Sequence, residues 1–491
     1  MAFVSFQFPV FALVAIAALR ICRPGIGKKF VLCLINIVFI FSFVSSPIEG
    51  IPFFAFIALG YFATLLAARF QYSVVVWPLI LLIVAIFVWL KRYSIVMALP
   101  GLHFVFITVG LSYVLFRVLH LLIDVAQRAV RIPTVLDYFI YTTFFLTFVS
   151  GPIELYGSFA EQMRQPVIPM TRDTLDRGLR RTLIGYLYLL ALAVPLASLN
   201  GVLRTAFYAA WNEHALLHAT ANYSAAASVY LVYLYINFVA YMDIVIGIGE
   251  LAGFSLPENF NKPYNAANFV DLWNRWHITL SQWFKFYLFN PLLKAMAARW
   301  GSRDVTNYLG AAAYFVTFGV MGLWHGTTGV FVIYGLALGL GATINKLWQI
   351  VLTNRLGKDG YRTLGRRSWY QHLARSSTLA YFAIAVTCLW IAPTQVGMFA
   401  NPIAWLCTVG AFVLLTLVGA ILAMAQQYLV ARQHAIAAAF NTIGSNAFIR
   451  RGFSLIDGQG DLVWNISMIF AVLLLSAAVY SFVPEIVYKG Y

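Results

Sequence analysis

The sequence contains few charged residues. Of its 491 residues, 10% are Asp, Glu, Lys or Arg and 62% are hydrophobic, whereas about a quarter of the residues in an average soluble domain are charged. This composition excludes an ordinary soluble protein and a disordered or collagen-like chain. At about 20 apolar residues per membrane-spanning helix, it predicts an all-α polytopic membrane protein with roughly 11–13 transmembrane or re-entrant helices.

Cysteine and several catalytic motifs are also scarce or missing. The four cysteines lie in or beside apolar segments without CxxC spacing, so we expect neither a disulfide framework nor a zinc site. The sequence has no Walker loop, no GxGxxG in a strand-to-helix unit and no GxSxG elbow. These absences disfavour nucleotide hydrolysis, hydride transfer and covalent catalysis by a serine.

Positive charge exceeds negative charge, with 33 Lys and Arg against 17 Asp and Glu, a net charge of +16. In a membrane protein, such residues collect in cytoplasmic loops and beside anionic lipid headgroups. We therefore expect membrane lipids as partners and no nucleic acid. The basic clusters in short connections are Arg20-Arg23-Lys28-Lys29, Arg177-Arg180-Arg181 and Arg362-Arg366-Arg367.

The apolar runs follow one another without a long linker, repeat or low-complexity tract, so residues 1–491 are interpreted as a single integral membrane domain. Breaks at 150–152 and 322–326 predict helices that end inside the protein, where neighbouring groups can satisfy the exposed backbone. The runs are 3–19, 30–46, 51–68, 74–90, 95–116, 138–150, 183–199, 225–248, 308–323, 328–348, 376–392, 402–430 and 463–484.

The charges between the first runs suggest an orientation. The run 3–19 lacks a basic leader and a cleavage site, so we expect a retained helix. The basic connection 20–29 predicts a cytoplasmic loop and an external N-terminus. Lys91 and Arg92 then fall on the wrong side, which predicts that one early run does not span.

The interval 251–302 is polar and rich in tryptophan. Trp273, Trp276 and Trp283 follow an approximately helical spacing, and indole rings favour the headgroup level. We therefore expect an amphipathic helix lying in the membrane plane.

Ionisable residues inside apolar runs are candidates for function, because burying charge in a membrane is costly. His325 stands between apolar runs in Gly-Leu-Trp-His-Gly. The residues alone are equally consistent with a catalytic base and with a buried histidine that is hydrogen-bonded to a neighbour. His277 could be exposed on an interfacial helix without a function. Further candidates are Asp243 and Glu250, seven residues apart, and Arg117, His120 and Asp124.

His214 and His218 have the i,i+4 spacing of zinc ligands, but no third ligand is evident nearby. The pattern favours a polar loop helix, and we expect no bound metal or other cofactor.

Three stretches together resemble the membrane-bound O-acyltransferase family. The long middle motif runs from Gly253 to Phe284 and contains Pro-Glu-Asn-Phe-Asn-Lys-Pro-Tyr and Trp-Asn-Arg-Trp-His. The Trp-His-Gly at 324–326 resembles a family signature, and Gly151-Pro152-Ile153 resembles a third. These motifs lie within 95–345, and the chain is most similar to the bacterial branch whose members O-acetylate alginate or transfer D-alanine to teichoic acid.

The resemblance implies that His325 is the catalytic histidine, that His277 is the second family histidine, and that the helices surround a tunnel or funnel leading to His325. We assign His325 as the general base, Trp324 as a pocket wall and the amides near Gly326 as oxyanion donors. We expect Asp243 to orient a histidine or to pair with Arg275. Further residues expected to bind substrate or support the site are Asn259, Asn261, Arg275 and Trp276.

Two positions depart from the family pattern. The stretch 283–287 reads Trp-Phe-Lys-Phe-Tyr, without the acidic residue of many bacterial members. A common aspartate is replaced by Asn237. These departures bear on contacts with substrates or partners and leave the acyl-transfer chemistry intact.

The resemblance implies transfer of an acyl group, acetyl in the first instance, to hydroxyls of an exported or cell-envelope polysaccharide in the bacterial inner membrane. The donor would be acetyl-coenzyme A or an acylated phosphopantetheinyl carrier, with a periplasmic acyltransferase as a further partner. The alternatives are D-alanyl transfer to a teichoic-acid-like polymer, a non-enzymatic glycan transporter or flippase, and a structural subunit of an export machine.

Overall fold

The computed structural model describes residues 7–22, 25–44, 46–71, 73–101, 110–165, 169–302, 305–391 and 393–443, and the short pieces 467–469, 471–472 and 475. Every regular element in these ranges is a helix, which confirms the all-α prediction. The apolar runs expected at 3–19, 95–116 and 463–484 lie partly or mostly outside the described residues.

The α-helices differ widely in length, from the five residues of α11 to the 42 of α17. Their bounds are α1 (Gln7–Ile21), α2 (Ile26–Phe41), α3 (Ile51–Phe70), α4 (Ser73–Leu90), α5 (Leu111–Ala126), α6 (Val135–Thr142), α7 (Tyr156–Arg164), α8 (Arg172–Leu187), α9 (Val194–Asn212), α10 (Leu216–Ala252), α11 (Phe269–Trp273), α12 (Ile278–Phe284), α13 (Asn290–Trp300), α14 (Thr306–His325), α15 (Gly329–Arg366), α16 (Ser368–Ala385) and α17 (Pro402–Ile443).

Within the described chain, six helical segments are long and apolar enough to cross a membrane. This number is consistent with a polytopic membrane protein. The described parts of the runs 3–19, 30–46, 308–323 and 376–392 belong to shorter or less apolar helices. The six segments are Pro47–Phe70, Ser73–Leu90, Arg172–Asn212, Leu216–Ala252, Gly329–Arg366 and Pro402–Leu429.

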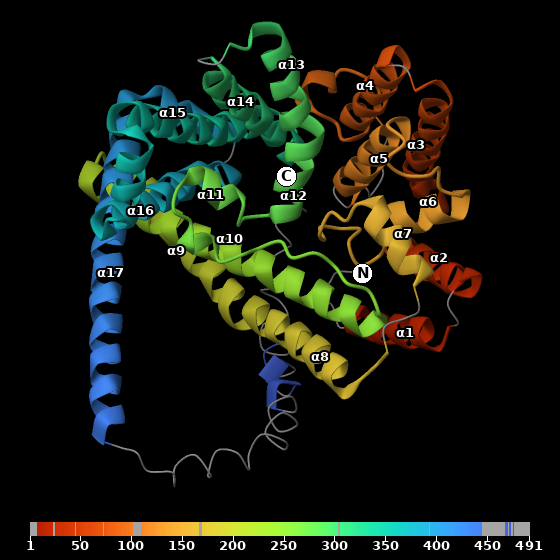
Figure 1. Ribbon diagram of the computed structural model, residues 1–491, viewed down its shortest axis with the longest axis horizontal. Coiled ribbons are helices and arrows are strands. Elements are labelled where there is room, and N and C mark those ends of the chain that lie inside the picture. Colours follow the sequence, from red (N-terminus) through yellow and green to blue (C-terminus); the bar gives the residue numbers. More distant parts are fainter. Residues whose placement is uncertain are drawn as a thin grey trace.

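The helices form groups around a central region (Figure 1). The N-terminal helices α1–α7 lie on one side, and α8 and α9 follow one another in a line alongside α10. Helices α14 and α15 pack as a pair, while α16 packs against α17. The short helices α11 and α12 lie between these groups, so the middle of the sequence occupies the middle of the molecule.

The chain breaks inside the protein after α6, eight residues before the Ser150-Gly151-Pro152 at which the sequence predicted the break. Helix α6 ends at Thr142, and the irregular stretch that follows is almost wholly buried. Arg117 of α5 donates hydrogen bonds to the carbonyl oxygens of Tyr141, Thr142 and Thr147 at 3.1, 2.9 and 2.7 Å. The buried guanidinium thus satisfies backbone groups that the broken helix leaves without partners.

The interval 251–302 does not form the single amphipathic helix that the sequence predicts. The interval divides into α11, α12, a π-helical turn and α13, joined by irregular turns. Trp273, Trp276 and Trp283 are 7–8% exposed, because they pack against other aromatic rings, whereas Trp300 is 59% exposed. Tryptophans at this spacing suit a membrane interface and a protein core equally well, and here most of them belong to the core.

The basic clusters are not simply solvent-exposed loops. Lys28 is fully buried in α2, with its ammonium 4.7 Å from the centre of the Phe254 ring. Arg20 donates to the carbonyl oxygens of Glu250 and Leu251 at the end of α10. The cluster at 177–181 lies within α8 and is partly neutralised by ion pairs.

Candidate functional site

The end of α14 carries His325, and glycines let this helix approach α15 closely. A Cβ atom at Gly322 would lie 2.4 Å from the Cα of Gly335, and one at Gly335 would lie 2.7 Å from the Cα of Gly322. The two backbones therefore touch where α14 ends. This crossing fixes the position of His325 relative to the first turns of α15.

Aromatic rings surround His325. Its imidazole centre lies 4.8 Å from the centre of the Trp324 ring and 5.3 Å from that of Tyr334. The next residue, Gly326, has no room for a side chain, because a Cβ atom there would lie 2.1 Å from the Phe331 ring. The glycine after the histidine thus allows the ring of Phe331 to lie against the turn.

His277 occupies a strained turn immediately before α12. Its backbone has φ 44° and ψ 55°, in the left-handed region that non-glycine residues rarely adopt. The buried Asn259 holds the following residues: its carbonyl oxygen accepts from the Ile278 N–H at 2.9 Å, and its side-chain oxygen accepts from the Thr279 N–H and hydroxyl at 3.0 and 2.7 Å. Asn259 therefore fixes the turn that places His277.

The two histidines line one cavity of about 30 Å³, although 47 residues separate them in the sequence. Neither lies in a candidate membrane-spanning segment, and burial lowers the pKa of each below its usual value. Both imidazoles are therefore neutral near pH 7. The other lining residues are Leu234, Phe238, Trp273, Trp276, Leu280, Phe331, Tyr334 and Leu389.

His277 has no hydrogen-bond partner at either ring nitrogen among the described residues. Its ring is 2% exposed and lies 4.9 Å from the Phe238 ring, centre to centre. A buried polar group without a partner costs about 1–3 kcal/mol, so such a group in a cavity beside a second histidine is a candidate for contact with a ligand.

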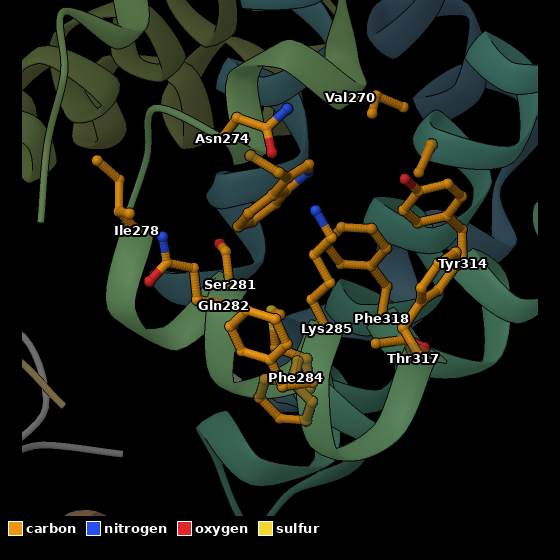
Figure 2. Close-up of a pocket in the computed structure, with 15 residues that line it drawn as sticks. Val270, Asn274, Ile278, Ser281, Gln282, Phe284, Lys285, Tyr314, Thr317 and Phe318 are labelled. Atoms are coloured by element: carbon orange, nitrogen blue, oxygen red, sulfur yellow. The ribbon is translucent and has the colours of Figure 1, made fainter. Parts of the chain in front are cut away.

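A larger pocket, of about 170 Å³, shares Trp273 with the histidine cavity. Figure 2 shows Lys285 extending into it, near Phe284 and Phe318. Lys285 and Phe286, which belong to the stretch that lacks the acidic residue of the family pattern, both line this pocket. Its walls combine aromatic rings with a few polar groups, as is common in sites for small molecules.

Several predicted site residues meet at the cavity. Trp276 lines it with the two histidines, Trp324 meets His325 edge to face, and Asn259 holds the turn of His277. Asn261, by contrast, is exposed. Its N–H donates to the carbonyl oxygen of Arg275 at 2.9 Å, so these two residues close the polar side of the turn.

The predicted pairing of Asp243 is wrong. Asp243 forms an ion pair with Arg181 at 2.9 Å, and Arg275 pairs with Asp271 at 3.0 Å. Arg181 also donates to both carboxylate oxygens of Glu258, at 2.6 and 2.7 Å. Asp243 thus ties α10 to α8 and to the segment before Asn259, rather than contacting a histidine or Arg275.

The remaining ionisable candidates have partners in the protein. The Tyr287 hydroxyl donates to Asp124 at 2.9 Å, and Arg177 pairs with Glu250 at 2.8 Å. His120 accepts from the Tyr156 N–H at 3.1 Å and contacts the Tyr141 hydroxyl at 3.1 Å. These bonds join helices and turns around the site.

His214 precedes α10, whereas His218 lies within it, so the two do not share a helix face. Among the residues that the structure describes, no group of three His, Cys, Asp or Glu side chains could hold a metal ion.

Sequence reasoning missed several residues that line the cavity, among them two aromatic residues that follow His325. Phe331 and Tyr334 stand in the first turns of α15 and line the cavity with the two histidines. A signal was available, because they follow His325 by six and nine residues across a glycine-rich break. Such a break returns the next helix onto the histidine, and its first inward residues then become the wall of the site.

The profile of the membrane-bound O-acyltransferase family matches residues 69–365, more than half of the chain. Similar curated proteins include the teichoic acid D-alanyltransferase of Bacillus subtilis (strain 168), which is 30% identical over 235 residues, covering 46% of this chain and 56% of the relative. The probable alginate O-acetylase of Pseudomonas fluorescens is 28% identical, covering 49% of this chain and 45% of the relative.

A third relative is the peptidoglycan O-acetyltransferase of Helicobacter pylori (strain ATCC 700392 / 26695), 28% identical over 44% of this chain and 38% of the relative. The chain thus spans about half the length of the curated relatives it matches. The matched family region includes both histidines and every residue that lines their cavity except Leu389.

Proposed function

Because the chain belongs to the membrane-bound O-acyltransferase family, we propose that it transfers an acyl group, acetyl in the first instance, from a thioester to hydroxyls of an exported or cell-envelope polysaccharide. The observation that carries this proposal is the pair of neutral histidines, His325 and His277, on one cavity whose walls are largely aromatic and aliphatic. The chain would be a multi-pass protein of the bacterial inner membrane.

The chemistry needs one base and one site for negative charge. His325 takes the proton of the acceptor hydroxyl as its oxygen attacks the thioester carbonyl carbon. The tetrahedral intermediate carries an oxyanion, which backbone N–H groups near Gly326 would stabilise. The carbon–sulfur bond then breaks, and the thiolate recovers the proton from His325. The products are an O-acyl ester and a free thiol, so atoms and charge balance.

His277 would position a reactant in this scheme. Its ring nitrogens have no partner among the described residues, so an imidazole N–H can donate to a substrate oxygen without first breaking a bond in the protein. The left-handed turn and the Asn259 bonds hold the ring in place.

The pocket that contains Lys285 offers an approach for the donor. It adjoins the histidine cavity through Trp273 and measures about 170 Å³. The Lys285 ammonium would attract the phosphate of coenzyme A or of a phosphopantetheine arm. Both donors share a phosphate-bearing thioester arm, so the proposal extends to either.

The names of the relatives bear on the acceptor. They describe D-alanylation of teichoic acid and O-acetylation of alginate and peptidoglycan. All three acceptors are cell-envelope or exported polymers, so we expect a polymer hydroxyl here. The teichoic acid relative, at 30% identity, supports D-alanyl transfer as the second candidate. A further periplasmic acyltransferase could complete delivery of the acyl group.

Transport without chemistry has less support. A transporter or flippase would need charges lining a substrate path, and the candidates Arg117, Asp124, Asp243 and Glu250 each contact a partner within the protein. A purely structural subunit would not need a strained, unpartnered histidine.

The test uses the purified full chain with radiolabelled acetyl-coenzyme A, acetylated carrier protein or D-alanylated carrier protein, each with alginate, peptidoglycan or teichoic acid. We expect label in ester linkage on one polymer, and none with His325→Ala. Transfer of D-alanine alone would select the second candidate. No labelled polymer with any pair, while the chain moves unmodified glycan across proteoliposomes, would overturn the proposal in favour of transport.

A further inference from the structure

A buried lysine lies beside the end of α14. Lys91 follows α4 and is 8% exposed. No carboxylate forms an ion pair with it among the described residues. A lysine in such surroundings is costly to bury, so its position calls for a reason beyond membrane orientation.

The Lys91 ammonium joins α5 to the last turn of α14. It donates to the Ser112 hydroxyl at 2.9 Å and to the carbonyl oxygen of Trp324 at 3.5 Å. The Trp324 indole N–H donates in turn to the carbonyl oxygen of Ser112 at 3.4 Å. These three residues therefore form a closed ring of hydrogen bonds, and Trp324 is held both by its backbone and by its side chain.

The residues after Lys91 bind the same turn. The Tyr93 hydroxyl donates to the carbonyl oxygen of Leu323 at 2.7 Å, and the Ser94 N–H donates to that of Thr327 at 3.2 Å. The last carbonyls of a helix have no partner within it and carry partial negative charge. Lys91, Tyr93 and Ser94 thus supply donors, and Lys91 a positive charge, to the end of α14 and the turn that follows it.

We propose that Lys91 is a positioning residue for His325, acting through the Trp324 backbone and Ser112 to fix the helix end on which the imidazole stands. The inference rests on the proposed role of His325 as the base. The adjacent ammonium also disfavours a second positive charge nearby, and, after burial itself, it lowers the pKa of His325. Lys91 thereby helps to keep the base neutral.

The test compares three full-length variants. Lys91→Met removes the donors and the charge but keeps the bulk of the side chain, and Ser112→Ala opens the ring of bonds while leaving Lys91 in place. Arg92→Met is the matched control, because Arg92 loses the same charge in the same turn but donates to the carbonyl oxygens of Met97 and Leu99.

For Lys91→Met we expect kcat to fall about ten- to a hundredfold, the range for a misplaced catalytic group, with KM for donor and acceptor unchanged. The kcat of Ser112→Ala should fall less, and the kcat of Arg92→Met should resemble that of the wild type. Hydrogen exchange should accelerate in the peptide covering 318–330 for Lys91→Met and not for Arg92→Met. Should Lys91→Met fail to fold, Ser112→Ala provides the same two measurements.

If Lys91→Met and Ser112→Ala keep the wild-type kcat, or change only KM, the inference is overturned. Acyl transfer by the wild type in the same assay would still support the proposed function. If the wild type transfers no acyl group, the proposed function fails. In that case, unchanged hydrogen exchange at 318–330 in Lys91→Met would also reject the positioning role of Lys91. Accelerated exchange would retain that role.

Discussion

The two histidines of the central cavity are held in different ways. His325 ends a 20-residue helix whose last turn receives hydrogen bonds from the segment 91–94. His277 stands in a left-handed turn between two short helices, with no partner for its ring nitrogens among the described residues. A group that must give and take a proton benefits from a fixed helix end, whereas a group that binds a substrate benefits from unused donors and acceptors.

The largest expected effect separates the two histidines directly. His325→Ala should lower acyl transfer at least about a hundredfold, the lower end for a lost general base, with expression and detergent stability near those of the wild type. Label transfer to the polymer measures the loss. His218→Ala, which alters an exposed histidine of α10, is the control and should transfer normally. Near-normal glycan acylation in a strain carrying only His325→Ala would remove His325 from the chemistry.

The second prediction tests the turn after His325. Gly326→Ala places a Cβ atom 2.1 Å from the Phe331 ring, and overpacking of this kind costs about 1–3 kcal/mol. We expect a lower thermal midpoint in detergent and reduced transfer. Gly329→Ala is the matched control, because its Cβ atom would meet nothing within 4 Å. Equal behaviour of the two variants would show that the ring moves freely and that the turn is not fixed.

A third, smaller effect concerns His277. His277→Ala should reduce transfer by about tenfold, less than the loss of a base. His277→Asn should recover part of it, because an amide supplies a hydrogen bond and asparagine tolerates the left-handed backbone. Both variants are assayed with the same acceptor as His325→Ala. If His277→Asn is as inactive as His325→Ala, His277 takes part in the proton transfer itself.

The smallest expected effect lies far from both histidines in the sequence. Arg362, Arg366 and Arg367 are exposed, so reversing these charges to Glu should raise the donor KM by a few fold and leave kcat unchanged, because steering alters encounter more than chemistry. Titrating acetyl-coenzyme A and an acylated carrier protein separately measures the change and identifies the donor. Unchanged donor dependence would indicate that the acyl group arrives from another face of the protein.

The sequence predicted the helical fold and the position of His325 because hydrophobic runs and a Trp-His-Gly break are local signals. It could not predict that Lys91 is buried, because a lysine that follows an apolar run has the same sequence pattern in an exposed loop and in a buried contact. The ion-pair partner of Asp243 could not be predicted for a related reason. Arg181 lies 62 residues away along the chain, and only the packing of α8 on α10 brings the two together.

The ion pairs of Arg181 are partly exposed, so they connect the turn of His277 with the ionic strength of the solution. Arg181 joins α8 to Asp243 of α10 and to Glu258, the residue before Asn259, and the side chains of Arg181 and Glu258 are 27% and 58% exposed. Dissolved ions screen partly exposed pairs much more than buried ones. Rising ionic strength should therefore loosen the turn of His277 before it affects the buried hydrogen bonds of Lys91 near His325. Concentrated salt should then weaken substrate binding while His325 stays in place.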